Sequence, residues 1–485
     1  MKRKNKYEKK LCIILCLITL NSLSGCGNKK EYATSGESLT TVEFKEQEQS
    51  QKIKISAVEC DSFIRAYADI NAEQYPYSKL FGISAAMSKM QESRNLIGEH
   101  QYSFFKADKT VNADKLLEIV KKNNAEYRKD TVKKNMTKEF SDKQLKTYCG
   151  WIAETVNWQI EKNSGFDFET VGCVLGNLKI VEKNSTNYGG FDCKSGVMSI
   201  NPKMIKATGK KNDYEKFIFT HEAIHMLQSG CADMTGEDSE NYGVSYSFSE
   251  LLVNPLKLSW LYEGSAELNA AQFRNTDIST YKALVAFIKS LDLATLVNDT
   301  PNSGMAENIC FGHNPEDLYR ELGFENEQTA AAFLYSAEIM LTKPDDFFKA
   351  YGNESEDKTE FVNRNIKPAV YETLSKMFYR NIAQRLCNTE MSLNDVFCLI
   401  SLHEAQINKQ LQLGSKESQE IYKSYTGEYA KIKEKFFELA GAGNLENISY
   451  SEYKIKYEDN GEYINADFSW LDENKRDIIK SIIGI

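Results

Sequence analysis

Residues 217–227 read Phe217-Ile218-Phe219-Thr220-His221-Glu222-Ala223-Ile224-His225-Met226-Leu227, an HExxH motif inside an apolar run. On a helix, His221 and His225 lie one turn apart on the same face, so their imidazole nitrogens can meet at one cation. Glu222 sits beside the first histidine, where its carboxylate can hold a water molecule at the metal instead of binding the metal. The stretch therefore predicts a buried helix with a metal site on one face.

Chance alone is a weak explanation of this motif, because the chain has only five histidines. A random HExxH match is expected in fewer than about one such chain in a hundred. The alternative is a helix with two hydrogen-bonded histidines and an exposed glutamate.

A second stretch can complete the site: Leu258-Ser259-Trp260-Leu261-Tyr262-Glu263-Gly264-Ser265-Ala266-Glu267-Leu268. A catalytic zinc usually takes three protein ligands and leaves a fourth position for water. Glu263 and Glu267 are one helical turn apart, so one can bind the metal while the other accepts the free ring N–H of a ligand histidine. The small Gly264 and Ala266 would let two helices approach closely. Alone, this stretch would read as an ordinary amphipathic helix with two solvated acids.

Taken together, the two stretches resemble the gluzincin metallopeptidases, the superfamily of thermolysin, the aminopeptidase-N type and the bacterial collagenases. The resemblance implies that His221, His225 and Glu263 are zinc ligands, that Glu222 is the general base and that Glu267 orients a ligand histidine. It covers about 50 residues strongly and about 170 loosely, out of 485.

The spacing departs from these families in one respect. The gap between His225 and Glu263 is longer than usual and contains a polar insertion at 236–243. Three acids in this gap stay open as alternative third ligands: Asp233, Glu240 and Glu250.

Metzincins, a neighbouring class, are excluded by inspection. Their motif extends to HExxHxxGxxH, but this chain has Gln228 and Cys231 where that motif needs glycine and histidine.

The N-terminus predicts export and a lipid anchor. Residues 1–26 combine a basic start, an apolar run at 11–23 and the sequence Leu23-Ser24-Gly25-Cys26, which resembles a bacterial lipobox with cleavage before Cys26 and lipid on its thiol. The run is shorter than the roughly 20 apolar residues of a spanning helix, although an uncleaved anchor is the alternative. Residues 27–52 are polar and predict a flexible tether. We expect the body on the bacterial cell surface, at the outer face of the cytoplasmic membrane.

The net charge and the cysteine count limit the partners and the covalent cross-links that can be expected. The net charge is -9 with acids and bases interspersed, so nucleic-acid binding is not expected. Eight cysteines follow Cys26 without a CxxC pair, which predicts at most three disulfides of unknown pairing.

Periodicity predicts helices in the N-terminal region 53–170, with apolar positions at helical spacing over 60–70, 79–97, 113–127 and 142–162. His100 is expected at the surface. Four strands are then expected as a β-meander entering the HExxH helix: 171–175, 178–181, 188–193 and 197–202.

Either 189–193 or 197–201 is the candidate for a sheet edge that would pair with an extended peptide through main-chain hydrogen bonds. An ordinary hairpin with a glycine turn explains these residues equally well.

Downstream, a helix is expected over 278–293 and a loop over 298–315. Zincins commonly add a tyrosine or histidine that donates to the tetrahedral oxyanion, and the candidates are His313, Tyr319 and, by loose alignment, Tyr335. Tyr335 can equally be a core aromatic. His403-Glu404 lacks a second histidine four residues on, so no second metal site is expected.

The sequence therefore predicts an α+β, predominantly helical protein. A zincin-like core at 171–352 stands between the helical region 53–170 and a helical lobe at 353–485. The expected function is a lipid-anchored zinc peptidase that acts on peptides or proteins. The alternatives are a non-catalytic surface-binding lipoprotein, as adhesin or pseudo-peptidase, and a metallohydrolase for a non-peptide amide.

Overall fold

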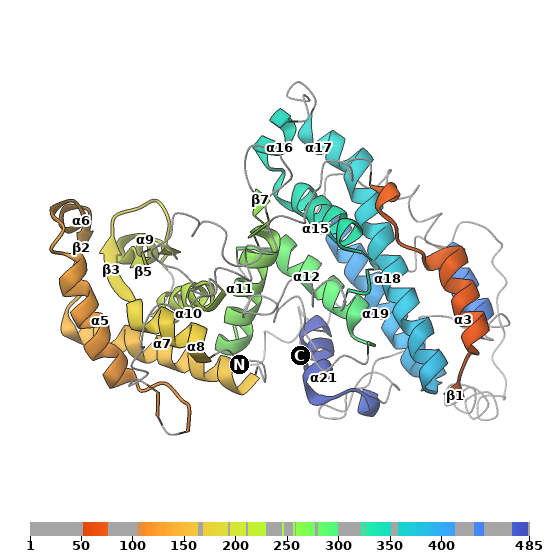
Figure 1. Cartoon of the computed structure of the whole chain (residues 1–485), viewed down its shortest axis with the longest axis horizontal. Coiled ribbons are helices and arrows are strands. Elements are labelled where there is room, and N and C mark those ends of the chain that lie inside the picture. The colour runs from red at the N-terminus through yellow and green to blue at the C-terminus, as the bar shows by residue number, and fades with distance from the viewer. Residues whose placement is uncertain are drawn as a thin grey trace, which may run out of the picture.

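The structure is a computed structural model. The residues that it describes are 52–75, 105–106, 108–162, 168–192, 195–209, 212–228, 245–246, 256–257, 259–276, 280–298, 322–324, 326–350, 357–412, 431–440 and 468–483. These residues are mostly helical and include one four-stranded sheet, which confirms the predicted predominantly helical α+β class. Figure 1 shows the sheet and its helices on one side of the molecule and a stack of long helices on the other.

Two helices of the N-terminal region have the predicted bounds, α5 (Ala113–Tyr127) and α7 (Asp142–Lys162). The side chain of Asn112 accepts the free backbone N–H groups of Asp114 and Lys115, which fixes the start of α5. The helix predicted over 60–70 is α3 (Ala57–Phe63) continued by the π-helical turn η1 (Ile64–Ala68).

The strand predicted at 171–175 is wrong, since these residues belong to α8 (Phe168–Asn177). Val171, Val174 and Leu175 are all buried, and their spacing places them on one face of a helix. A short apolar run does not by itself distinguish a buried strand from a buried helix.

The remaining predicted strands exist, but they do not form a meander. The sheet has the order β2 (Thr137–Lys138), β3 (Lys179–Lys183), β5 (Val197–Ile200) and β4 (Gly189–Asp192). β5 runs parallel to β3 and antiparallel to β4, so β4 lies at the edge. β3 and β5 carry most of the buried apolar residues and therefore take the centre, whereas the Gly-Gly-Phe-Asp sequence of β4 leaves its residues half-exposed or exposed.

A first core, which we call the sheet core, lies between this sheet and helices α5, α7, α8 and α10 (Asn212–Gln228). The apolar residues of the HExxH helix α10 are buried all around, as the uncharged sequence predicts. Tyr148 of α7 stacks on Phe219 of α10 with ring centroids 4.0 Å apart.

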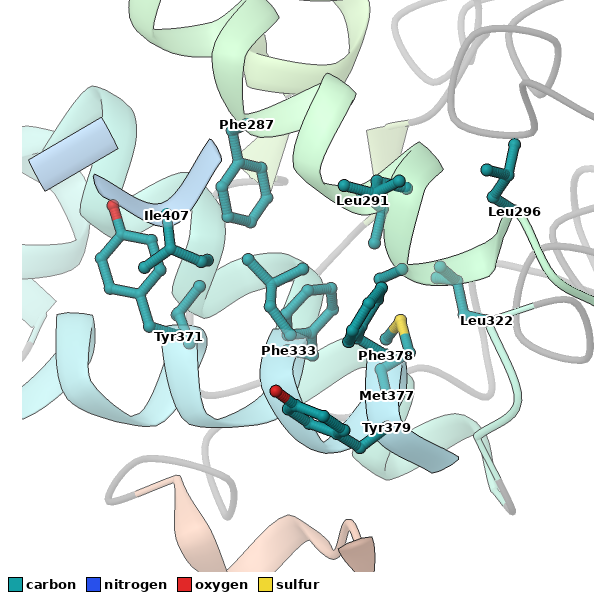
Figure 2. Packing of buried hydrophobic residues seen from close by; sticks show 14 of the residues in the cluster. Phe287, Leu291, Leu296, Leu322, Phe333, Tyr371, Met377, Phe378, Tyr379 and Ile407 are labelled. Carbon is teal, nitrogen blue, oxygen red and sulfur yellow. The ribbon is translucent and has the colours of Figure 1, made fainter. Parts of the chain in front are cut away.

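A second core, the helical core, is larger. Its main helices are α12 (Lys282–Thr295), α15 (Glu327–Thr342), α18 (Lys367–Asn388), α19 (Leu393–Gln412) and α21 (Glu473–Ile483). Figure 2 shows Phe287 and Leu291 of α12 above Phe333 of α15 and Phe378 of α18. Helix α3 also packs here, and β1 (Lys52–Ile53) pairs with β8 (Met391–Ser392).

Helix α11 (Ser259–Arg274) joins the two cores. Its Trp260 and Leu268 belong to the helical core, whereas Ala266 and Ala270 belong to the sheet core. At its C-terminal end, Arg274 donates to Thr220 of α10 at 2.7 Å. The region 53–170, predicted as one helical unit, contributes to both cores. Residues 111–156 pack with the sheet, whereas residues 53–75 pack with the C-terminal helices.

The other elements are short. They are η2 (Ala72–Gln74), α6 (Thr131–Met136), α9 (Pro202–Ala207), β6 (Ser245–Tyr246), β7 (Leu256–Lys257), α16 (Asp345–Ala350), α17 (Lys358–Phe361), η6 (Val362–Ile366) and η9 (Phe468–Trp470).

Within the described ranges, no helix is both long and apolar enough to cross a bilayer. Four of the described cysteines are free thiols: Cys60, Cys149, Cys387 and Cys398. Several predictions concern residues outside the described ones: the signal segment 1–26 with Cys26, the tether up to residue 51, the helix at 79–97 and His100.

Candidate metal centre

The HExxH residues meet on one face of α10. The Nε2 atoms of His221 and His225 lie 3.0 Å apart, and both rings are buried. Their planes are nearly perpendicular, with centroids 4.6 Å apart. This is the arrangement that the spacing of the two histidines predicts.

Glu263 of α11 completes the cluster. Its Oε2 lies 3.2 Å from His225 Nε2 and 3.4 Å from His221 Nε2. One ligand atom from each of these three residues falls within 4.8 Å of the others, which makes them the group among the described residues that can hold a metal ion. The Glu263 side chain is 30% exposed, so the cluster is accessible to solvent at this residue. The alternative ligands Asp233, Glu240 and Glu250 lie outside the described residues.

Glu267 lies behind His221, as expected for an orienting residue. Its Oε2 is 3.3 Å from Nδ1 of His221, and its Oε1 accepts the backbone N–H of Thr280 at 3.2 Å. Glu267 is 2% exposed, and the Thr280 N–H holds its Oε1. A carboxylate at Nδ1 favours the tautomer that leaves Nε2 free to bind a cation.

Gln228 performs the corresponding task for His225, and the sequence had not singled it out for this role. Nδ1 of His225 donates to Oε1 of Gln228 at 2.7 Å. The Gln228 amide nitrogen donates in turn to the Tyr262 carbonyl at 3.1 Å and the Ser265 hydroxyl at 2.7 Å. Its position three residues after His225 on the same helix was the available signal.

Gly264 acts differently from the sequence expectation. A Cβ at this position would lie 2.7 Å from Ile288 Cδ1 and 3.0 Å from Leu284 Cβ, both of α12. The glycine therefore allows α11 to approach α12 closely. The small residue that enters the sheet core, where α10 packs, is Ala266.

Glu222 points to the edge strand β4. A Cβ on Gly189 would lie 2.9 Å from Glu222 Oε1 and 3.0 Å from its Cγ, so the strand passes directly over this carboxylate. The backbone N–H of Phe191 donates to it. Burial raises the pKa of Glu222 above its usual value, which is the direction that favours a group able to exchange a proton.

Tyr281, at the start of α12, is a site residue that sequence reasoning missed. Its phenol lies close enough to Glu263 for that carboxylate to raise the pKa of the phenol, and its ring stacks parallel to His221 with centroids 6.0 Å apart. Burial and the nearby Glu263 raise the pKa of Tyr281, which keeps the phenol protonated and able to donate. Tyr281 lies within the stretch 278–293, which was expected to be an apolar helix. The polar hydroxyl was the one sequence feature that could have marked it as a site residue.

Tyr335, the predicted oxyanion donor, lies on α15 with 1% exposure and belongs to the helical core. The tyrosine whose pKa is shifted by Glu263 is Tyr281. The role of Tyr335 stays a prediction, and His313 and Tyr319 lie outside the described residues.

Charges in the cluster are strongly coupled. Burial opposes the charged form of His221, but its bonds with Glu263 and Glu267 outweigh burial and raise its pKa to about 10. Burial likewise disfavours ionised Glu263, yet His221 and His225 hold its pKa far below the usual range. The ionised Glu263 therefore places negative charge beside Nε2 of both histidines, which suits a cation.

His403 is not part of this cluster. It is buried in the helical core and stacks on Phe378 with centroids 4.1 Å apart.

Comparison with known proteins adds no relative: no family model matches the chain, and neither a curated protein nor a solved structure is significantly similar to it. Fold and site together define a mostly helical α+β protein in which two buried histidines and one half-buried carboxylate form a cluster beside a sheet edge.

Proposed function

We propose that this protein is a zinc-dependent peptidase of the gluzincin type, with His221, His225 and Glu263 as metal ligands. The observation that carries the proposal is the convergence of these three donors, from two helices, beside Glu222 and the edge strand β4.

The donor spacing fits the ion. Tetrahedral zinc with bonds of about 2.0–2.1 Å requires neighbouring ligand atoms about 3.3–3.4 Å apart. The three atoms here are 3.0, 3.2 and 3.4 Å apart, close to one face of such a tetrahedron. The donor set of two imidazoles and one carboxylate is also one that catalytic zinc uses.

A zinc ion held there would act as a Lewis acid toward a carbonyl and lower the pKa of a bound water. Glu222 would accept a proton from the attacking water and return it to the departing amine. The Tyr281 hydroxyl would donate a hydrogen bond to the developing oxyanion, because its ring stacks on His221 and its pKa responds to Glu263.

The substrate would lie along β4. This strand ends the sheet in the order β2-β3-β5-β4 and passes over Glu222. Backbone groups of an edge strand that no neighbour uses can pair with an extended chain independently of its side chains. Of the two candidates from the sequence, the first contains β4, which is at the edge of the described sheet, whereas the second contains β5, which is paired on both sides.

The location that we propose is extracytoplasmic, with lipid on Cys26 holding the domain at the membrane. The lipobox-like sequence before Cys26 supports it. The substrate would then be a peptide or protein outside the cytoplasmic membrane.

Glu222→Gln tests the proposed chemistry. Purified protein with stoichiometric zinc is mixed with a peptide library, and cleavage is followed by mass spectrometry with and without a chelator. We expect the wild type to cleave peptides, the chelator to abolish cleavage, and Glu222→Gln to keep its zinc while losing about 10²–10⁴-fold in rate.

Glu215→Gln is the matched control, because Glu215 lies on the same helix and bonds to Tyr148 at 2.8 Å, away from the cluster. Activity that survives in Glu222→Gln would contradict the mechanism. Stoichiometric zinc without turnover in the wild type would favour a binding lipoprotein, and hydrolysis of small amides but not peptides would favour a non-peptide amidohydrolase.

A further inference from the structure

A buried acid outside the metal cluster faces the helix that carries two of the cluster's acids. Glu338 of α15 is 2% exposed. Its Oε2 accepts the backbone N–H of Trp260 at 3.1 Å, and Ser259 donates to it from both backbone and side chain. Its other oxygen accepts the hydroxyl of Thr342 at 2.7 Å.

The position of the donors explains why an acid is tolerated there. Ser259 and Trp260 are the first two residues of α11, and the first N–H groups of a helix have no partner within the helix. A carboxylate from another element satisfies them and also lies at the positive end of the helix dipole. Burial nevertheless raises the pKa of Glu338 to about 7. Placing this carboxyl group in the interior therefore costs free energy, although the helix N-terminus offers it partners.

A second bond joins the same two helices. The indole nitrogen of Trp260 donates to the carbonyl of Leu334 at 3.2 Å, one turn before Glu338 on α15. The Trp260 ring also meets Phe287 of α12 edge to face, with centroids 4.9 Å apart. The first turn of α11 is thus held against α15 in both position and rotation.

The metal ligand lies one turn further on. Glu263 follows Trp260 by three residues, so a rotation or shift of the first turn would move its carboxylate relative to the histidines of α10. The three donor distances of 3.0–3.4 Å leave little room for such a shift.

We propose that Glu338 is a positioning residue, which fixes the N-terminus of α11 so that Glu263 reaches the metal. This inference rests on the proposed zinc site, and it deepens that proposal by assigning a task to a residue outside the cluster. Glu338 touches neither the ligands nor the reacting atoms in this role.

The experiment compares three variants of the full chain. Glu338→Leu removes both carboxylate oxygens, which accept from Trp260 and Thr342. Thr342→Val removes only the hydroxyl that donates to Oε1. Glu338→Gln keeps an oxygen that can accept from Trp260 and offers an amide N–H that can donate to the Thr342 hydroxyl. Asn326→Ala is the matched control, because Asn326 caps the same helix α15 at its other end by accepting the N–H of Thr329 at 2.9 Å.

Zinc affinity is measured by competition with a chromophoric chelator, and the visible spectrum of the Co²⁺-substituted protein reports the geometry of the ligands. We expect Glu338→Leu to weaken zinc binding by about 10–100-fold and to change the Co²⁺ bands, because the first turn of α11 would no longer hold Glu263 in place beside the two histidines. Thr342→Val should show a smaller loss of the same kind. Glu338→Gln should restore binding to within about threefold of the wild type.

Asn326→Ala should lower the urea midpoint of unfolding without changing zinc affinity or the Co²⁺ bands, which separates positioning from general destabilisation. Wild-type affinity and bands in Glu338→Leu would overturn the inference while leaving the zinc site intact. If that variant does not fold, unchanged affinity and bands in Thr342→Val overturn it. A wild type that binds neither Zn²⁺ nor Co²⁺ would instead refute the proposed function.

Discussion

Nδ1 of His225 lies 2.7 Å from Oε1 of Gln228, and the amide of Gln228 reaches across to the Tyr262 carbonyl on the ligand helix α11. One side chain therefore orients the ring of His225 and joins the two helices that carry the proposed metal ligands. Because Gln228 is an amide, it does this without adding charge to a cluster that already holds three acids.

Replacing Gln228 by Ala should weaken zinc binding by about 10–100-fold, since the ring of His225 would lose the partner that selects its tautomer. Gln228→Glu should bind zinc at least as well as Gln228→Ala, because a carboxylate can also accept from Nδ1. Chelator competition measures both. Gln272→Ala on α11 is the control, since Gln272 bonds to Lys162. Equal affinities of wild type and Gln228→Ala would contradict the assigned role.

Gly189→Ala should reduce peptide cleavage by about tenfold or more while zinc binding stays unchanged, because a Cβ there would displace the Glu222 carboxylate from its position. Gly190→Ala provides a neighbouring control, since its Cβ would meet only Ser199 Oγ at 3.7 Å. The measurement is kcat/KM on a cleaved library peptide together with zinc content. If both alanine variants lose activity equally, the cause lies in the strand and not in Glu222.

Tyr281→Phe should lower kcat by about 10²–10³-fold with little change in KM or zinc affinity, because the lost hydroxyl would act on the transition state. Tyr335→Phe is the informative comparison, since Tyr335 is the donor that the sequence resemblance favours. Steady-state kinetics on one peptide substrate distinguishes them. A large loss in Tyr335→Phe with a small loss in Tyr281→Phe would reverse the assignment.

His403 predicts a pH dependence of stability. Burial lowers its pKa to about 3, against 6.5 for an unperturbed histidine. Between these values the unfolded chain binds a proton that the folded protein does not, so the free energy of unfolding falls as the pH drops from 6.5 toward 3. His403 contributes up to about 1.4 kcal/mol per pH unit to this slope.

Urea unfolding of wild type and His403→Leu at a series of pH values tests this dependence. The variant should lose stability less steeply over this interval. Ser375→Ala, which removes the hydroxyl 3.5 Å from His403 Nε2 but keeps the ring, should retain the wild-type slope. Parallel slopes for wild type and His403→Leu would show that the histidine is protonated in the folded state.

The spacing of residues along the sequence was enough to predict a feature wherever all the residues that form it lie on one helix. His221, Glu222 and His225 share a helix, so their spacing alone predicted that two ring nitrogens would meet beside a carboxylate. Helices 113–127 and 142–162 were predicted with their observed bounds for the same reason, because a periodic apolar stripe is a property of the segment itself. Glu263 required the resemblance in addition.

The sequence pattern gave a wrong or incomplete prediction where the structure of a segment depends on contacts with residues far along the chain. The apolar residues Val171, Val174 and Leu175 suit a buried strand or a buried helix, and packing against α5 and the sheet decides for the helix. The order of the strands depends likewise on which of them are covered on both faces, which no single strand encodes.

What the sequence by itself determined is therefore the pairing of His221 and His225 beside Glu222 and the mostly helical class, since both follow from residue type and spacing along single helices. Only the tertiary structure decided which groups surround those donors: Gly189 over Glu222, Tyr281 on Glu263 and Glu338 at the start of α11. Each of these contacts joins elements that are distant in sequence, and the distance between two such side chains is set by how whole helices and strands pack, which the local order of residues does not specify.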